Sequence, residues 1–400
     1  MLSAEQLDKL PASALALWQQ VEEDILCDMA RRIAKTGLLT ETAGWQARRL
    51  EVMRLFRRDV VRRLAQTLGR SEAEVRAMLT AAGTQTLASD DAVYRAAGLS
   101  PAAPNDSPAL LNLLTSGAKQ TNGSLANITA TTADTATAQL GRTLDRAWLQ
   151  VSSGAFDYQT ATRRAVAEIA ARGLEAVAYD TGHVDTLEVA VRRALLTGVN
   201  QTAAKLQIAR MDELDCDLVE TTAHAGARPE HAAWQGQVFS RSGRHPRYPS
   251  LVAVTGYGTG PGLCGWNCRH QMHPFFEGIS EPLYTPERLA KLDAREIEYQ
   301  GKRYTRYEIS QMQRNLERRV RRWKRRFAAE EAAGLESTKS ALRLSTARDA
   351  LRQFAAETDG AVDSSRIGVH GYSRSQAGRA QAVERWAADN QPFRPRRDAS

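Results

Sequence analysis

The sequence predicts a mainly α-helical protein that contains one small α+β domain. Ala, Arg, Glu and Leu dominate most of the 400 residues, and apolar residues recur there at the three-and-four spacing of one helical face. The segment 221–280 differs, because it holds five of the seven His, two of the four Cys and a dense run of Gly. A chain of this length can form two or three domains with a substantial core.

Residues 1–215 are expected to form a helical region. Apolar residues in register predict helices over 12–35, 43–68, 140–151, 158–172 and 184–213. Ser71 followed by Glu74 matches a capping box, so a further helix is expected to start at Ser71. The run 98–108 carries three prolines and is expected to be a loop. The Thr- and Ala-rich segment 115–140 has low hydrophobicity, which favours an exposed or weakly packed segment with a thin apolar stripe over 125–136.

The central domain is expected to span 216–282. Five glycines and a proline lie between 256 and 265, where a helix would lose about 1 kcal/mol per Gly and about 3 kcal/mol for Pro. Glycine also permits positive φ and close backbone approach. The runs 238–239 and 251–254 are rich in β-prone residues and bounded by turn residues, so both are predicted to be strands.

The central segment also contains residue types that bind zinc through thiolate and imidazole. They are Cys264, Cys268, His270 and His273, with His224 and His231 upstream. The spacing is not that of a Cys-x2-Cys knuckle and no second Cys pair follows, so no metal and no cofactor are assigned. In the alternative interpretation the two cysteines are small buried residues, and loops are held by hydrogen bonds from Asn267, Arg269 and His270.

The same residues also allow an enzymatic interpretation. His224, His231, Asn267 and His270 could imitate a metal nuclease, and Cys268 beside a His could imitate a thiol nucleophile with its base. Neither set is complete or correctly spaced, so no catalytic residue is assigned. The alternative function is a zinc-assisted hydrolase, a nuclease or peptidase, built on His224, His231, Cys268 and His270.

After the central domain the chain is expected to form a basic helical extension, 283–357. Pro286 suits the first turn of a helix, and 301–306 allow a turn or hairpin. The stretch 308–333 places Ile309, Val320 and Phe327 on one helical face, with the helical pattern continuing thinly to Glu357. The remainder, 358–400, is expected to be largely flexible, with one short helix over 377–388.

The basic face of the 308–333 helix has three interpretations: a solvated face, a contact with nucleic acid or an acidic partner, and a membrane-surface helix. Nothing else in the chain suggests a membrane. The candidate binding residues are Arg318, Arg319, Arg321, Arg322, Lys324, Arg325 and Arg326.

Composition narrows the class of protein further. The formal net charge is +8 and the pI is near 9.4, which favours an acidic partner. No apolar run approaches the ~20 residues that span a bilayer, and no signal peptide precedes the helices, so we expect a protein made in the cytoplasm. Four Cys do not make a disulfide framework.

Two stretches carry a resemblance to a known family: HAGARPEHAAWQGQVFS (224–240) and TGYGTGPGLCGWNCRHQMHPFFEGIS (255–280). Together they resemble the phage minor capsid protein 2 family, which is related to MuF-type head morphogenesis proteins. The resemblance implies a structural protein of a phage or prophage virion, assembled in the bacterial cytoplasm. It also implies a role in head assembly or DNA packaging near the portal. The implied partners are portal or capsid proteins and packaged DNA, with no small-molecule substrate and no membrane. The implied folding signature comprises His224, Gly226, Arg228, His231, Trp234, Gly236, Gly256, Tyr257, Gly258, Gly262, Gly265, Asn267, Cys268, Arg269, His270 and Pro274.

Overall fold

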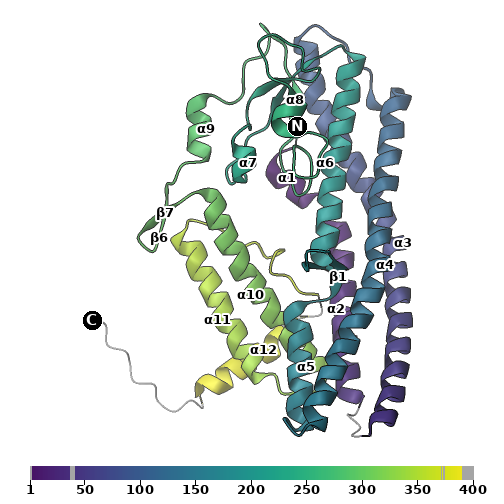
Figure 1. Cartoon of the computed structure of the whole chain (residues 1–400). Coiled ribbons are helices and arrows are strands. Elements are labelled where there is room, and N and C mark those ends of the chain that lie inside the picture. The colour runs from purple at the N-terminus through teal and green to yellow at the C-terminus, as the bar shows by residue number, and fades with distance from the viewer. Residues whose placement is uncertain (1, 37–40, 371, 373, 390–400) are drawn as a thin grey trace. The chain divides into compact units, whose positions relative to one another are not determined.

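A computed structural model describes residues 2–36, 41–370, 372 and 374–389 of the chain (Figure 1). The fold is mainly helical with small antiparallel sheets, which confirms the predicted fold class. The chain divides into two compact units. Unit 1 comprises Met1–Trp18, Leu64–Ala130 and Glu188–Gln311, and unit 2 comprises Gln19–Arg63, Thr131–Leu187 and Met312–Ser400. The four-part division drawn from the sequence stays a prediction.

The part of the chain before the central sheet is largely helical. Its elements are α1 (Ala4–Lys9), α2 (Ala12–Lys35), α3 (Thr42–Ala96), the 3-10 helix η1 (Pro104–Asp106), α4 (Pro108–Ser152), α5 (Tyr158–Arg172), β1 (Glu175–Ala178), β2 (Val184–Thr186) and α6 (Leu187–Glu213).

The helices predicted over 12–35 and 158–172 are confirmed by α2 and α5. The helix start predicted at Ser71 is wrong, because α3 is continuous through it. The Ser71 hydroxyl donates to the carbonyl of Leu68 at 2.8 Å, so it bonds back within the helix and caps nothing. The helix predicted over 184–213 begins only at Leu187, since Val184–Thr186 pair with β1 as a strand.

In unit 1 the chain segments of α3, α4 and α6 lie side by side (Figure 1). Glycines let α4 and α6 approach closely. A Cβ on Gly117 would lie 2.4 Å from Thr202 Oγ1, and one on Gly198 would lie 2.3 Å from Thr121 Oγ1. Leu125 of α4 is fully buried, so this part of the Thr- and Ala-rich segment is packed and not weakly held as expected.

The central part of the chain forms a three-stranded antiparallel sheet in the order β4-β3-β5. Its strands are β3 (Leu218–Thr221), β4 (Val238–Ser240) and β5 (Met272–Pro274). Val219 of the middle strand pairs with Phe239 on one side and with Pro274 on the other. Val219, Phe239 and Met272 are fully buried in a core that also includes Tyr94 of α3.

The strand predicted over 251–254 is wrong, because this run forms the short helix α8 (Leu251–Thr255). The Ser250 hydroxyl accepts a hydrogen bond from the Ala253 amide at 3.3 Å and caps the start. Gly256 ends the helix in the left-handed conformation, with φ of 63°. Two caps six residues apart outweigh the β propensity of the valines between them. The strand predicted at 238–239 is confirmed by β4.

The remaining elements of unit 1 follow the sequence closely. They are α7 (Pro229–Ala232), α9 (Pro286–Leu292), β6 (Ile297–Tyr299) and β7 (Lys302–Tyr304). The helix start at Pro286 and the hairpin are confirmed. Gln300 and Gly301 both have positive φ, 50° and 73°, as a two-residue hairpin turn requires.

In unit 2 the C-terminal helices are α10 (Arg306–Ala332, from Met312 onwards), α11 (Thr338–Glu357) and α12 (Arg374–Asp389). Helices α10 and α11 run side by side (Figure 1), and Val320 packs with Leu344 and Leu351 in their shared core. The short helix predicted over 377–388 is confirmed by α12, which is a little longer. Residues 390–400 of the predicted tail lie outside the described residues.

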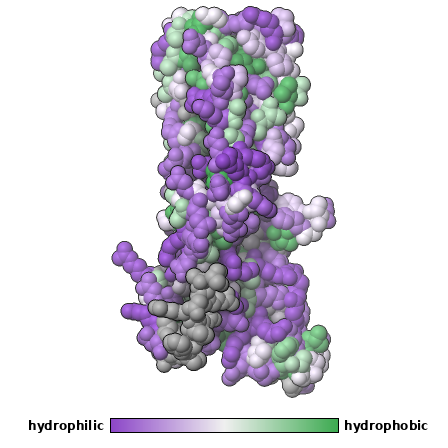
Figure 2. Space-filling view, turned by 90° about the vertical axis from the view of Figure 1, so that its left-hand side faces the viewer, coloured by the Kyte–Doolittle hydropathy of each residue, from purple (hydrophilic) through white to green (hydrophobic). Residues whose placement is uncertain are grey.

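Figure 2 shows a face that is mostly hydrophilic, with hydrophobic residues in small separate groups. Within the described ranges, no helix combines the length and the apolar character that crossing a bilayer requires.

The glycine-rich loop after α8 generates the first prediction. A Cβ on Gly262 would lie 2.0 Å from the carbonyl oxygen of Gly256, a contact that only backbone movement relieves. We expect Gly262→Ala to lower the free energy of unfolding by about 3 kcal/mol, measured by chemical denaturation. The matched control is Gly123→Ala in α4, where nothing lies within 4 Å of the added Cβ. It should raise stability by about 0.5–1 kcal/mol. Equal effects of the two substitutions would contradict the assigned loop packing.

Candidate functional site

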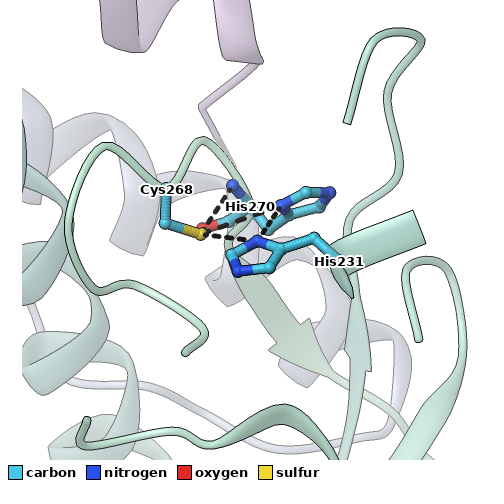
Figure 3. A group of neighbouring side chains, drawn as sticks. All are labelled: His231, Cys268 and His270. Carbon is cyan, nitrogen blue, oxygen red and sulfur yellow. Dashed lines mark hydrogen bonds between the residues drawn. The ribbon is translucent and has the colours of Figure 1, made fainter. Parts of the chain in front are cut away.

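Three side chains that can bind a metal converge in unit 1: His231, Cys268 and His270 (Figure 3). The Nδ1 atoms of His231 and His270 lie 3.3 Å apart, and the sulfur of Cys268 lies 3.7 Å from each of them. All three side chains are buried, with at most 5% of any residue exposed. The cluster joins α7 to the loop that precedes β5.

Local backbone geometry positions each of these three side chains. His231 lies on α7, a single turn that Pro229 begins. Asn267 adopts the left-handed conformation with φ of 53°, which Asn tolerates better than most residues, and it turns the chain into Cys268. The amide of Asn200 on α6 donates to the carbonyls of Cys268 and His270, both at 3.0 Å.

The outer nitrogens of both imidazoles contact oxygen acceptors. His231 Nε2 lies 2.8 Å from the carbonyl of Pro261, and His270 Nε2 lies 3.1 Å from Oε1 of Gln235. The same Gln235 oxygen accepts from the backbone amide of His224 at 3.1 Å. The cluster therefore has a second layer of polar contacts that fixes ring orientation.

Burial sets the protonation of the cluster. It lowers the pKa of His231 and holds the pKa of His270 well below its ordinary value, since a charged imidazolium would lose its hydration. Burial also raises the pKa of the Cys268 thiol. At neutral pH the cluster is therefore uncharged, with two neutral imidazoles and a thiol.

Aromatic contacts pack around the cluster. The ring of His224 lies 4.4 Å from that of His270, centroid to centroid, and Trp234 lies 4.6 Å from His231 and 4.9 Å from His270. Trp234 is 5% exposed and closes one side. The structure thus brings five residues of the predicted signature together: His224, His231, Trp234, Cys268 and His270.

Other signature residues shape the loops next to the cluster. Arg228 donates to the carbonyls of Pro261 and Trp266, both at 3.2 Å, and so closes the glycine-rich loop on itself. Gly265 allows the carbonyl of Gly260 to lie where a Cβ would be, 2.1 Å away. Arg269 forms an ion pair with Asp8 at 2.9 Å.

The rest of the signature lies at turns and in the core of unit 1. Gly226, Gly236, Gly256 and Gly258 have positive φ, Tyr257 packs against the central core, and Pro274 lies in β5. That these residues form a folding signature stays a prediction, and their geometry agrees with it.

Two residues of the zinc set considered from the sequence lie outside the cluster. Cys264 is buried, but its thiol donates to the His270 carbonyl at 3.6 Å. His273 points to Glu220, with Nε2 2.9 Å from its carboxylate. His231, which the sequence set included as an upstream residue, supplies the third side chain of the cluster, although it lies 37 residues before Cys268 in the chain. Sequence spacing could not give this, because the sheet brings the two segments together.

Sequence reasoning also missed Asn200 and Gln235, which bind the cluster loop and the His270 ring. No motif marks either of them. For Gln235 one signal existed: it follows His231 by four residues, the spacing that puts two side chains on the same side of a helical turn.

The basic residues of α10 divide into two groups. Arg318, Arg319 and Arg322 are exposed, whereas Arg321, Lys324, Arg325 and Arg326 are partly buried. Lys324 donates to the Ile367 carbonyl at 2.6 Å, and burial lowers its pKa to about 8. Arg326 pairs with Glu330 at 2.8 Å. Three of the seven candidate binding residues therefore present their side chains to solvent.

Arg325 pairs with two internal carboxylates. It pairs with Glu22 at 3.0 Å and with Glu23 at 2.6 Å, and both carboxylates are buried. These contacts join α10 to α2 within unit 2. The positive charge of Arg325 is compensated internally, and its role is to hold the fold.

The fold and the cluster define a mainly helical protein whose central polar residues hold one loop conformation. Residues 2–356 match the family described as phage minor capsid protein 2, so the chain belongs to that family. The resemblance seen in the sequence is confirmed. Membership supports a structural role in the virion.

Two phage proteins, each named "Structural protein", are similar to parts of the chain. The protein of Lactococcus phage LL-H is 30% identical over 197 residues, which is 48% of this chain and 50% of that protein. The protein of Lactococcus phage mv4 is 40% identical over 90 residues, 22% of this chain and 63% of that protein. The chain thus spans about half the length of the first relative. No solved structure matches the chain.

The ion pairs of Arg325 generate the second prediction. Arg325→Ala removes a cation that contacts two buried carboxylates, so we expect the free energy of unfolding to fall by about 3–5 kcal/mol. Arg319→Ala is the matched control, since the same substitution at an exposed position of α10 should change stability by less than about 0.5 kcal/mol. Urea denaturation measures both. A small loss with Arg325→Ala would show that the carboxylates are not held by this residue.

Proposed function

We propose that the chain is a minor structural protein of a phage head, assembled in the bacterial cytoplasm, that binds portal or capsid proteins and contacts packaged DNA. Family membership over residues 2–356 carries the structural role. The finer assignment rests on the exposed arginines of α10, Arg318, Arg319 and Arg322. Arginine suits such a contact because its guanidinium binds carboxylates and phosphates in a bidentate manner.

The mechanism of this proposal is binding. The buried core of α10 and α11 fixes the helix, so the exposed arginines form a preset positive surface. Such a surface favours association with an acidic partner, because the helix backbone does not have to be ordered on binding. Against DNA, each phosphate neutralised by an arginine releases counterions and makes the affinity depend on salt.

The zinc-assisted hydrolase is not adopted as the function. A catalytic zinc keeps one coordination position open to substrate, whereas His231, Cys268 and His270 are each at most 5% exposed. A polymer such as DNA or a peptide chain needs direct access to the metal. Burial therefore favours a structural role for these residues.

The exposed arginines generate the third prediction. We expect the triple variant Arg318→Gln, Arg319→Gln, Arg322→Gln to fold normally and to enter phage heads at least about tenfold less than the wild type, equivalent to losing about 1.4 kcal/mol of binding. Quantitative mass spectrometry of purified particles, with the variant supplied to a phage that lacks its own copy, measures incorporation.

The control is a second triple variant with the same change in net charge: Arg70→Gln, Arg76→Gln, Arg163→Gln, all exposed on α3 and α5. Equal incorporation of the two variants would contradict the assignment to α10. The salt dependence of DNA binding, measured with the purified proteins, distinguishes DNA from a protein as the partner of these arginines. If DNA is bound by these arginines, the slope of log K against log salt should fall by up to about 3 in the α10 variant. If the α10 variant keeps the wild-type salt slope but enters phage heads less, these arginines bind a protein of the head and not DNA.

A further inference from the structure

The nitrogens that face each other in the central cluster are both without a proton. A carbonyl oxygen only accepts hydrogen bonds, so the 2.8 Å contact with Pro261 places the proton of His231 on Nε2. Gln235 Oε1 is identified as the oxygen because it accepts from the His224 amide. The 3.1 Å contact with this oxygen therefore places the proton of His270 on Nε2 as well. Both Nδ1 atoms point a lone pair into the cluster.

This arrangement is short of donors. The two Nδ1 lone pairs lie 3.3 Å apart, and the single thiol proton of Cys268 can be donated to only one of them. A buried acceptor without a donor costs about 1–3 kcal/mol. A cation at the centre of the three atoms would satisfy both nitrogens and the sulfur together.

The distances between the three atoms fit one particular coordination. Around a tetrahedral zinc ion, with Zn–N bonds of about 2.05 Å and Zn–S bonds of about 2.3 Å, two nitrogens lie about 3.3 Å apart and a nitrogen and a sulfur about 3.6 Å apart. The three edges of the cluster are 3.3, 3.7 and 3.7 Å. The side chains therefore stand at the spacing of three corners of a zinc tetrahedron.

We propose that His231, Cys268 and His270 bind one zinc ion that fastens α7 to the loop before β5. Imidazole with thiolate is a ligand set that suits zinc. The contacts from His231 to Pro261 and from His270 to Gln235 are the outer hydrogen bonds that orient metal-binding imidazoles. This assignment is independent of the virion partner.

The chemistry of binding balances simply. The thiol proton of Cys268 leaves to solvent as the Zn–S bond forms, and the imidazoles donate their Nδ1 lone pairs without losing a proton. His224 packs its ring against His270, but its nitrogens do not belong to the group of ligand atoms that converge, so the described part of the chain supplies three ligands. Burial of the ligands makes the ion structural.

The zinc content of the full-length protein is the fourth prediction. Protein purified without a polyhistidine tag and dialysed should hold about one zinc per chain, measured by plasma mass spectrometry. Removing the ion with a chelator should lower the melting temperature, and adding zinc back should restore it. Replacement by cobalt should give visible d–d bands and a thiolate-to-cobalt charge-transfer band in the near ultraviolet.

Two serine substitutions provide a matched test, because both cysteines are buried and only one belongs to the triangle. Cys268→Ser should weaken zinc binding by more than about 100-fold and abolish the charge-transfer band, since outer hydrogen bonds alone are worth about 10–100-fold. Cys264→Ser should keep both. Gln235→Leu should weaken zinc binding by about 10–100-fold while keeping the band.

Wild-type protein is decisive even if a variant fails to fold. A wild-type chain that holds no stoichiometric zinc, keeps the same melting temperature with and without zinc, and shows no thiolate band with cobalt would overturn the proposal. Equal loss of zinc in Cys264→Ser and Cys268→Ser would overturn it too.

Discussion

The central part of the chain depends on one hydrogen-bonding group, the side-chain amide of Asn200. This amide, on α6, donates to the carbonyls of Cys268 and His270, both at 3.0 Å, and only 1% of Asn200 is exposed. The loop there makes no regular backbone ladder, so its buried carbonyls need such a partner. By holding the two carbonyls on either side of Arg269, Asn200 turns the Cys268 and His270 side chains toward His231.

The same helix satisfies other buried polar groups by the same principle. Gln207 donates to Asp90 at 2.8 Å and also to the carbonyl of Met272, and Arg210 donates to the carbonyl of Ala102 at 2.7 Å. Burial raises the pKa of Asp90 to about 7, despite the bond from Gln207. Helix α6 therefore donates hydrogen bonds to buried polar groups of α3, of β5 and of the loop at Ala102. A structural virion protein needs such fixed loops if they are to present one surface to a partner.

Helices whose bounds depend on apolar periodicity and on capping residues could be predicted from the sequence. The bounds of α2 and α5, the start of α9 and the basic helix α10 follow from apolar spacing and from Pro286. Sequence-based prediction was wrong where capping or tertiary contacts determine the local structure or the partner of a side chain. Residues 251–254 look like a strand until Ser250 and Gly256 cap them as a helix. The sequence placed His231 with Cys268 and His270, but it also included Cys264 and His273, which have other partners in the fold. Arg325, which the sequence indicated as a binding residue, forms ion pairs with two buried carboxylates.

Hydrogen exchange of the Asn200→Leu variant, followed by mass spectrometry, tests most directly whether Asn200 holds the loop that carries Cys268 and His270. Leucine has a similar volume but leaves the Cys268 and His270 carbonyls without their donor. We predict that backbone amides over 264–272 exchange at least about tenfold faster than in the wild type, equivalent to about 1–3 kcal/mol. Amides of α5 should keep their wild-type rates. Unchanged protection over 264–272 would contradict the claim that α6 imposes the geometry of the site.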